Sequence, residues 1–211
     1  MEKEIYIIRH GETDFNKMGI AQGRGVNASL NALGMAQGAA FYQHYKHLRF
    51  DKVYTSTLQR THQTVQGFLQ DELPWQQLAG LDELSFGIWE GHADTDERKQ
   101  VFNRILQCWN EGNCDLAFEN GESPNQVAQR LKEALEVIIS ADGEKRVLVC
   151  MHGRSLLILL CLLSKMPVSR MTDFKHQNTG LYRLQYKNGE FSILEMNDVK
   201  HLEALASLTA G

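Results

Sequence analysis

Short apolar runs alternate along the chain with longer segments in which apolar residues recur every three or four positions. Runs rich in β-branched or aromatic residues occupy residues 4–8, 52–55 and 146–151, and such runs predict strands buried on both faces of a parallel sheet. The longer segments predict amphipathic or buried helices. They cover residues 31–48, 58–70, 94–109, 124–138 and 156–163.

Helix-capping residues precede several of these segments. Asn31 is expected to cap the first helix, and Ser56 or Thr57 the second. Ser123 is followed by Pro124 and, three residues on, by Gln126, which is the pattern of a capping box with proline at the first helical position. The apolar residues that follow predict one buried helix face.

Two alternating segments near the C-terminus flank Asn188-Gly189, a pair typical of a tight hairpin. A short helix is expected over residues 200–208. Strands that alternate with helices predict an α/β fold. We expect a three-layer α/β/α sandwich whose sheet is mainly parallel, with one antiparallel strand near the C-terminus. Residues 1–211 are expected to form a single domain.

Composition narrows the class of protein. The 211 residues carry a net charge of −4 and are 43% hydrophobic, which excludes a disordered chain and argues against a dedicated nucleic-acid binder. The four cysteines show no metal-binding or disulfide spacing. The apolar stretch 156–163 is too short to span a bilayer, and the first residues lack a secretory apolar core. These features predict a reduced, cytoplasmic protein without a membrane partner. A homo-oligomer is left open.

Chemistry-bearing residues follow three of the predicted strands. Arg9-His10 ends the first strand, Arg60 follows the second, and His152 ends the strand over 146–151. Taken alone, each is most simply a loop or surface residue. Because the carboxyl ends of parallel strands meet at one sheet edge, together they predict an anion-binding cleft. Glu83, in a loop between glycines and aromatics, adds one carboxylate.

At this point the sequence resembles the histidine phosphatase superfamily, which includes cofactor-dependent phosphoglycerate mutases and many small-molecule phosphatases. Five motifs match in the family's order across nearly the whole chain. The matching segments are IIRHGET at 7–13 with Asn16, STLQRT at 56–61 with Thr64, LDELSFGIWEG at 81–91, GES at 121–123, and VCMHG at 149–153.

The resemblance implies a phosphomonoester hydrolase that acts on a small phosphorylated metabolite through a phosphohistidine on His10. Arg9, Arg60 and a protonated His152 would hold the phosphoryl oxygens, and Glu83 would protonate the leaving group. Neither a cofactor nor a metal is expected. The resemblance also implies phosphate or substrate contacts from Asn16, Gln22, Gly23 and Gly153.

One loop departs from the family pattern, because residues 26–34 lack the usual Asp and Pro and carry an extra residue. That loop faces the substrate in relatives, so the identity of the substrate is not readable. Mutases of the family commonly have a longer segment after the Glu motif, with extra basic residues. Here residues 92–120 contain only Arg98, Lys99 and Arg104 as basic residues, which favours a phosphatase and leaves a phosphoglycerate mutase-type transfer as the alternative.

Other classes fit less well. His10, His152 and Glu83 could form a zinc set, but Arg9 beside His10 would repel a cation. A metal-dependent hydrolase and a non-catalytic phosphate-ester binder therefore remain outside alternatives. The glycines at 23–25 formally resemble a dinucleotide-binding pattern but do not follow a strand directly, so that interpretation is discarded.

Overall fold

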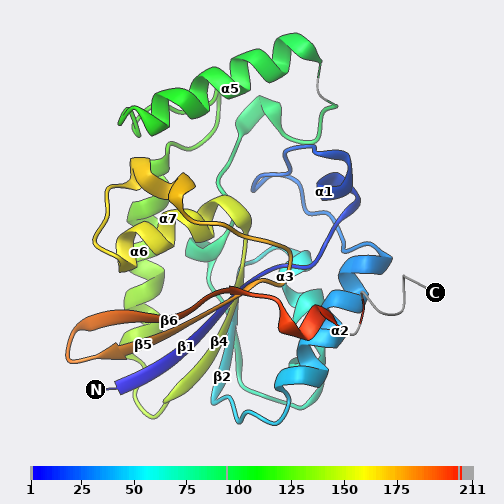
Figure 1. The fold of residues 1–211 in the computed structure, drawn as a ribbon, viewed down its shortest axis with the longest axis vertical. Coiled ribbons are helices and arrows are strands. Elements are labelled where there is room, and N and C mark those ends of the chain that lie inside the picture. The colour runs from blue at the N-terminus through cyan, green and yellow to red at the C-terminus, as the bar shows by residue number, and fades with distance from the viewer. Residues whose placement is uncertain (1, 94, 204, 206–211) are drawn as a thin grey trace.

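The computed structural model describes residues 2–93, 95–203 and 205, and within them six strands form one sheet in the order β3-β2-β4-β1-β5-β6 (Figure 1). Strands β1, β2, β3 and β4 run parallel, whereas β5 is antiparallel to both of its neighbours. β6 therefore runs in the same direction as β1, and β5 is the reversed strand. The strands are β1 (Glu2–Arg9), β2 (Lys52–Thr55), β3 (Trp75–Gln77), β4 (Arg146–Met151), β5 (Leu181–Lys187) and β6 (Glu190–Asp198).

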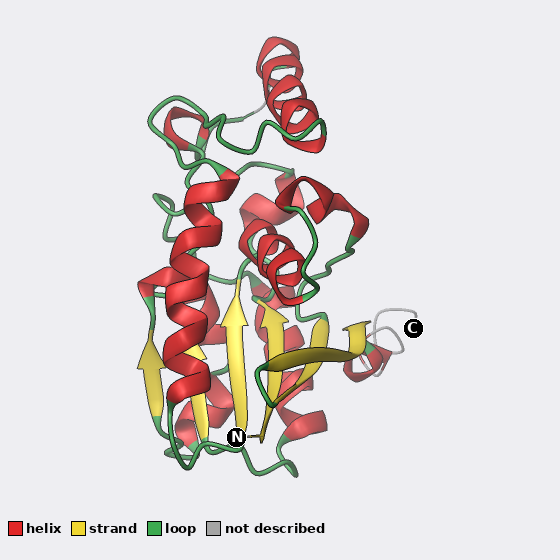
Figure 2. Cartoon of the chain, turned by 90° about the vertical axis from the view of Figure 1, so that its left-hand side faces the viewer, coloured by secondary structure: helices red, strands yellow, loops and turns green. Residues whose placement is uncertain are grey.

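Helices cover both faces of the sheet, which confirms the expected α/β layers (Figures 1 and 2). The helices are α1 (Asp14–Met18), α2 (Ala32–Tyr45), α3 (Gln59–Thr64), α4 (Gln66–Gln70), α5 (Asp96–Asn110), α6 (Pro124–Ser140) and α7 (Gly153–Leu163). Short 3-10 helices cover Ala79–Leu81, Gly87–Trp89, Val168–Asp173 and Lys200–Leu202.

Strand β4 shows why its sequence is apolar from Val147 to Met151. Leu148 and Cys150 pack on one face with Phe41 of α2 and Phe68 of α4. Val149 and its alternate neighbours pack on the other face, in the core that includes α6 and α7. Successive side chains of a strand point to opposite faces, so a strand between two helical layers needs apolar residues at every position. Each such fully buried side chain contributes roughly 1.5–3 kcal/mol.

The predicted helix starts at Asn31 and Ser123 are confirmed. Asn31 accepts a hydrogen bond from the backbone N–H of Gly34, and Ser123 forms a capping box with Gln126. The predicted caps at Ser56 and Thr57 are wrong. Helix α3 begins one residue later, after Leu58, without a side-chain cap.

The loop before α3 uses its hydroxyl groups elsewhere. Thr57 donates to the carboxylate of Asp82 at 2.9 Å, and Ser56 contacts His152. The expected helix over 58–70 is also divided at Val65, whose φ and ψ of −102° and 13° leave the helical range and separate α3 from α4.

Two elements have no counterpart in the sequence pattern. α1 is only five residues long and is held by a capping box between Thr13 and Asn16, and β3 is a three-residue edge strand with partly exposed side chains. The helix expected over 200–208 is a 3-10 helix over Lys200–Leu202, and part of that range lies outside the described residues.

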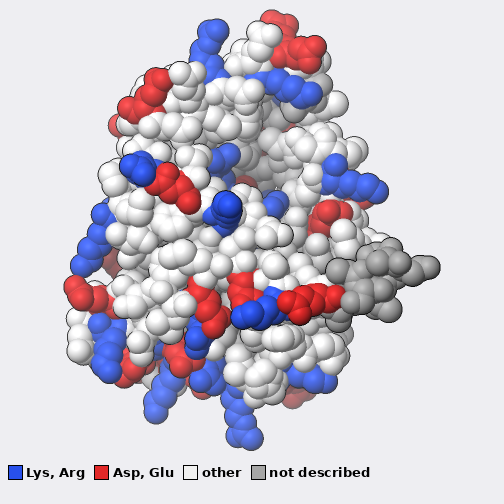
Figure 3. All heavy atoms as spheres, in the orientation of Figure 1, with Lys and Arg blue, Asp and Glu red and all other residues white. Residues whose placement is uncertain are grey.

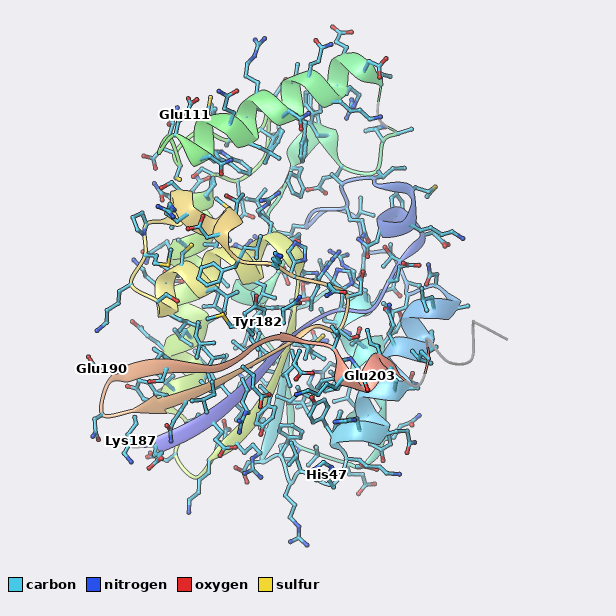
Figure 4. The ribbon with its side chains drawn as sticks, in the orientation of Figure 1. His47, Glu111, Tyr182, Lys187, Glu190 and Glu203 are labelled. Atoms are coloured by element: carbon cyan, nitrogen blue, oxygen red, sulfur yellow. The ribbon has the colours of Figure 1, made fainter. Side chains whose placement is uncertain are left out.

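The parallel strands end toward the side of the molecule that carries α5 (Figure 2). The hairpin tip between Lys187 and Glu190 lies on the same side of the view as Glu111, which follows α5, and well below it (Figure 4). Its turn residues Asn188 and Gly189 have φ of 53° and 85°, as a tight hairpin requires. Among the described helices, none combines the length and apolar character that crossing a membrane demands.

Candidate active site

A pocket of about 230 Å³ opens at the carboxyl edge of the sheet, below α5 and between α1 and α7. The space-filling view shows this hollow with Lys or Arg atoms on its wall (Figure 3). Its lining contains eight of the nine residues that the sequence singled out. These are Arg9, His10, Asn16, Gln22, Gly23, Arg60, Glu83 and Gly153.

His10 directly follows β1 and is buried, with 2% of the residue exposed. Its Nδ1 lies 2.7 Å from the carbonyl oxygen of Gly11. A carbonyl only accepts, so Nδ1 carries the proton and Nε2 keeps its lone pair. Burial and the positive charges of Arg60 and Arg9 hold the pKa of His10 well below its usual range. The imidazole is therefore a neutral base with one free nitrogen.

His152 differs from its expected state. Its ring is fully buried 5.1 Å from the ring of His10, and it is absent from the pocket lining. Arg60 donates from Nε to Nδ1 of His152 at 3.1 Å, so that nitrogen carries no proton. Burial, with the charge of Arg60, holds the pKa of His152 well below its usual range. The expectation of a protonated His152 is wrong because a cation occupies the site where its proton would point.

Arg60 joins three parts of the site. Besides His152, its guanidinium donates to the carbonyl oxygens of Val26 and Gly23, at 2.7 and 3.0 Å. Burial lowers the pKa of Arg60 to about 10, opposed by the charge of Glu83, so it stays a cation near neutral pH. Its burial at the start of α3 thus fixes a positive charge beside His10.

Glu83 is held at the N-terminus of α7. Its carboxylate accepts hydrogen bonds from the backbone N–H groups of Arg154 and Ser155, at 3.0 and 2.9 Å. It also accepts from the hydroxyl of Ser155 and from the N–H of Leu84. Helix N-termini favour negative groups, so α7 fixes the position of this carboxylate. The sequence motif gave no indication of this contact.

The backbone of the Glu83 loop is tied to α6. The guanidinium of Arg130 donates to the carbonyl oxygens of Asp82 and Glu83, at 2.8 and 3.0 Å. The same guanidinium pairs with Glu122 at 2.9 Å. Arg130 is therefore a positioning residue, and only its place on the helix opened by the GES motif could have signalled it.

Arg9 and His176 lie together on the α7 side of the pocket. Arg9 Nη1 lies 3.2 Å from Nδ1 of His176, and an arginine only donates, so His176 accepts there. Burial and the charge of Arg9 lower the pKa of His176 to about 4. A Cβ on Gly153 would lie 2.8 Å from Cε1 of His176 and 3.4 Å from Nε of Arg9. Gly153 thus lets these two side chains approach α7.

Asn16, Gln22 and Gly23 form the wall on the α1 side. The side-chain oxygen of Asn16 accepts from the backbone of Thr13 and from Asn178. Oε1 of Gln22 is buried without a hydrogen-bond partner among the described residues. Gly23 has a φ of 60°, and a Cβ there would overlap the carboxylate of Glu90. This wall therefore keeps unused hydrogen-bonding capacity at the pocket.

Three lining or supporting residues were not expected from the sequence. Arg154 and His176 line the pocket, and Asn178 donates to the carbonyl oxygen of His10 at 2.9 Å. Arg154 directly follows the second His-Gly step and could have been found by its adjacency. The positions of His176 and Asn178 before β5 carry no motif that points to the site.

The apolar wall comes from Phe86 and Phe102, which stack with ring centroids 5.6 Å apart. Phe86 is part of the buried core, and Trp89 packs against it. Among the described residues, no group of three or more His, Cys, Asp or Glu side chains is placed to hold a metal ion. The pocket therefore offers cationic and amide donors, one carboxylate and an aromatic side.

The comparisons with known proteins agree with this chemistry. The chain is 27% identical over 203 residues to fructose-2,6-bisphosphatase TIGAR B of Danio rerio, covering 94% of this chain and 74% of that protein. It is 28% identical over 218 residues to "Probable phosphoglycerate mutase GpmB" of Cronobacter sakazakii (strain ATCC BAA-894), covering 96% of each chain.

A solved structure shows the same architecture. The crystal structure of phosphoserine phosphatase from Entamoeba histolytica in complex with 3-phosphoglyceric acid superposes with a TM-score of 0.81 and 25% identity, covering 95% of this chain and 99% of that one. The family model described as "Histidine phosphatase superfamily (branch 1)" matches residues 5–199. The chain belongs to this branch of the histidine phosphatase superfamily.

Proposed function

We propose that the protein hydrolyses a small phosphate monoester through a phosphohistidine on His10. The observation that carries this proposal is the state of the His10 ring. Its Nδ1 proton is held by the carbonyl of Gly11, and the free Nε2 belongs to a pocket lined by Arg9 and Arg60. A neutral nitrogen with a free lone pair, beside two cations, suits attack on a phosphoryl group.

In the first step, Nε2 of His10 forms a bond to phosphorus while the bond from phosphorus to the ester oxygen breaks. Arg9 and Arg60 neutralise the phosphoryl oxygens, and the N–H of Gly153, the first residue of α7, adds a donor. Glu83, in its protonated form, gives its proton to the leaving oxygen. The products of this step are the free alcohol and the phosphoenzyme.

In the second step, water attacks the phosphorus, Glu83 takes the water proton, and the bond to His10 breaks. Inorganic phosphate leaves, and both His10 and Glu83 return to their starting forms. In this scheme His152 is a positioning residue. It accepts from Nε of Arg60 and so fixes the guanidinium that neutralises the phosphoryl oxygens.

The lining of the pocket supports hydrolysis over phosphoglycerate mutase-type transfer. Helix α5 contributes only Phe102 to the pocket lining, while Lys99 and Arg104 on the same helix are exposed. The segment therefore supplies no basic contact for a second phosphate. A panel of phosphorylated metabolites that includes 2- and 3-phosphoglycerate, scored for free phosphate and for isomerisation, separates the two activities.

Trapping of the phosphoenzyme tests the proposal. Rapid acid-free quenching with a radiolabelled phosphate ester should place label on His10, and His10→Ala should abolish both the label and phosphate release. His62→Ala is the matched control, because His62 lies on α3 outside the pocket lining and bonds the carbonyl of Ser56. A wild-type enzyme that turns over without label on His10 would contradict the covalent mechanism.

A further inference from the structure

The side-chain amide of Asn16 has an orientation that its neighbours fix chemically. The backbone N–H of Thr13 donates to this amide at 3.2 Å. An N–H group can bond only to the oxygen of an amide, so Oδ1 of Asn16 faces Thr13. The NH₂ group of Asn16 makes no hydrogen bond to any residue that the structure describes. Because Asn16 lines the pocket, both N–H donors of this group are left for a bound ligand.

Asn178, in the segment before β5, bonds to the same oxygen. Its NH₂ group donates to Oδ1 of Asn16 at 3.3 Å and to the carbonyl oxygen of His10 at 2.9 Å. Both acceptors are oxygens, so both protons of this NH₂ group are used. If the Asn16 amide turned over, two NH₂ groups would face each other and Thr13 would lose its acceptor. Asn178 therefore opposes any turn of the Asn16 amide.

The residue after Asn178 is held in an unusual backbone conformation. Thr179 is fully buried with a φ of 56°, in the left-handed region that β-branched residues rarely adopt. Its N–H donates to the carbonyl oxygen of Arg9 at 3.0 Å, and its hydroxyl donates to the carbonyl oxygen of Asn178 at 2.8 Å. The hydroxyl then accepts from Nε2 of His201 at 3.0 Å. Strained residues of this kind persist where several contacts hold them, and they cluster at functional sites.

We propose that Asn178 is a positioning residue that holds the Asn16 amide with its NH₂ group free to donate to the phosphoryl oxygens. This inference rests on the proposed function, which places a phosphoryl group in the pocket beside His10. Donors that are oriented before the ligand arrives need no rearrangement when it binds. Loss of the fixed orientation should weaken the binding of a phosphate group about three- to tenfold.

A double-mutant cycle tests whether Asn178 acts through Asn16. The ligand is inorganic phosphate, which binds without turnover, and calorimetry measures its Kd. Asn178→Ala should raise that Kd about three- to tenfold in the otherwise native chain. In an Asn16→Ala background the same substitution should change the Kd by less than about twofold, because the amide that it orients is gone. Equal effects in the two backgrounds overturn the inference, as does an Asn16→Ala variant that binds phosphate as tightly as the wild type.

Asn197→Ala is the matched control. Oδ1 of Asn197 accepts from the N–H of Gln177 at 3.0 Å, so it fastens the same segment without a contact to Asn16 or His10. This variant should lower Tm and keep the Kd for phosphate within about twofold of the wild type. If Asn197→Ala weakens phosphate binding as much as Asn178→Ala does, the effect belongs to the segment as a whole and the inference is overturned.

The side-chain NH₂ resonances of Asn16 provide a second measurement. They are identified by their loss in Asn16→Ala, and phosphate should shift them in the wild type. Asn178→Ala should reduce that shift, while Asn197→Ala should preserve it. Asn178→Leu removes the same donor with little loss of volume, so it takes the place of Asn178→Ala if the smaller side chain does not fold. An Asn16 shift that survives loss of the Asn178 donor contradicts the positioning role.

Phosphate binding and turnover distinguish this inference from the proposed function. Label on His10 with independent effects of Asn16 and Asn178 refutes the positioning role alone. Coupled effects of the two residues on phosphate binding, without label on His10, refute the covalent mechanism and keep the positioning role. A wild-type protein that binds no inorganic phosphate overturns the inference.

Discussion

Replacing Glu83 by Gln separates its role as a proton donor from its role in the fold. The carboxylate accepts from two N–H groups of α7, from the hydroxyl of Ser155 and from the N–H of Leu84. A glutamine keeps one oxygen and brings an NH₂ group to face at least one of these donors. One accepted hydrogen bond is then lost, and two N–H groups point at each other.

The cost to stability follows from that contact. Losing a hydrogen bond to a charged group destabilises the fold by about 1.5–3 kcal/mol. For a chain of this length, that lowers Tm by about 3–12 °C at 2–4 °C per kcal/mol. The loss of the proton donor acts on the reaction rate and not on stability. General acid catalysis accelerates a reaction roughly 10²- to 10⁴-fold when the leaving group needs a proton.

The assay compares kcat/KM for an alkyl phosphate and for p-nitrophenyl phosphate, whose leaving group departs without a proton. Glu83→Gln should slow the alkyl ester at least about tenfold more than the aryl ester. Glu90→Gln is the control. Glu90 also accepts from two N–H groups and a hydroxyl, those of Gly25, Phe86 and Ser85, but does not line the pocket. Glu90→Gln should lower Tm and change kcat/KM for both esters by the same factor. Equal losses for both esters in Glu83→Gln would refute the proton-donor assignment.

Two further predictions concern charge and capping. In an NMR titration, the imidazole of His10 should stay neutral as the pH falls through 6.5 and gain its proton only below that value, because burial, Arg60 and Arg9 lower its pKa; a midpoint at or above 6.5 contradicts this. Ser123→Ala should remove the capping box of α6 and destabilise the fold by about 1 kcal/mol, whereas Ser140→Ala at the exposed end of α6 should leave Tm unchanged in a thermal melt.

The parts of the fold predicted from the sequence are those set by buried strands. The run over residues 147–151 of β4 is apolar at every position because helices cover both faces of the sheet, so the sequence pattern alone predicts a buried strand. The same logic placed His10 and Arg60 at one sheet edge. α1 escaped prediction because five residues give no helical period. β3 escaped because an edge strand with exposed side chains has no apolar run.

The sequence predicted most of the residues that form the site. It predicted their protonation states and hydrogen-bond partners less well. The protonation of His152 depends on which atom of Arg60 faces its Nδ1, and residue spacing does not contain that information. The tie between Glu83 and α7 likewise joins residues more than seventy positions apart. The single-domain organisation stays a prediction. The roles assigned to the site residues also stay predictions, and the variants described above test them.

The net charge of −4 and the cationic pocket act at different distances. At physiological ionic strength, exposed charges are screened beyond about 8 Å, so the acidic balance has little effect on a small ester inside the pocket. Inside the pocket, the guanidinium groups of Arg9, Arg60 and Arg154 act at close range. Under the proposed function, this arrangement favours small phosphate esters over nucleic acids.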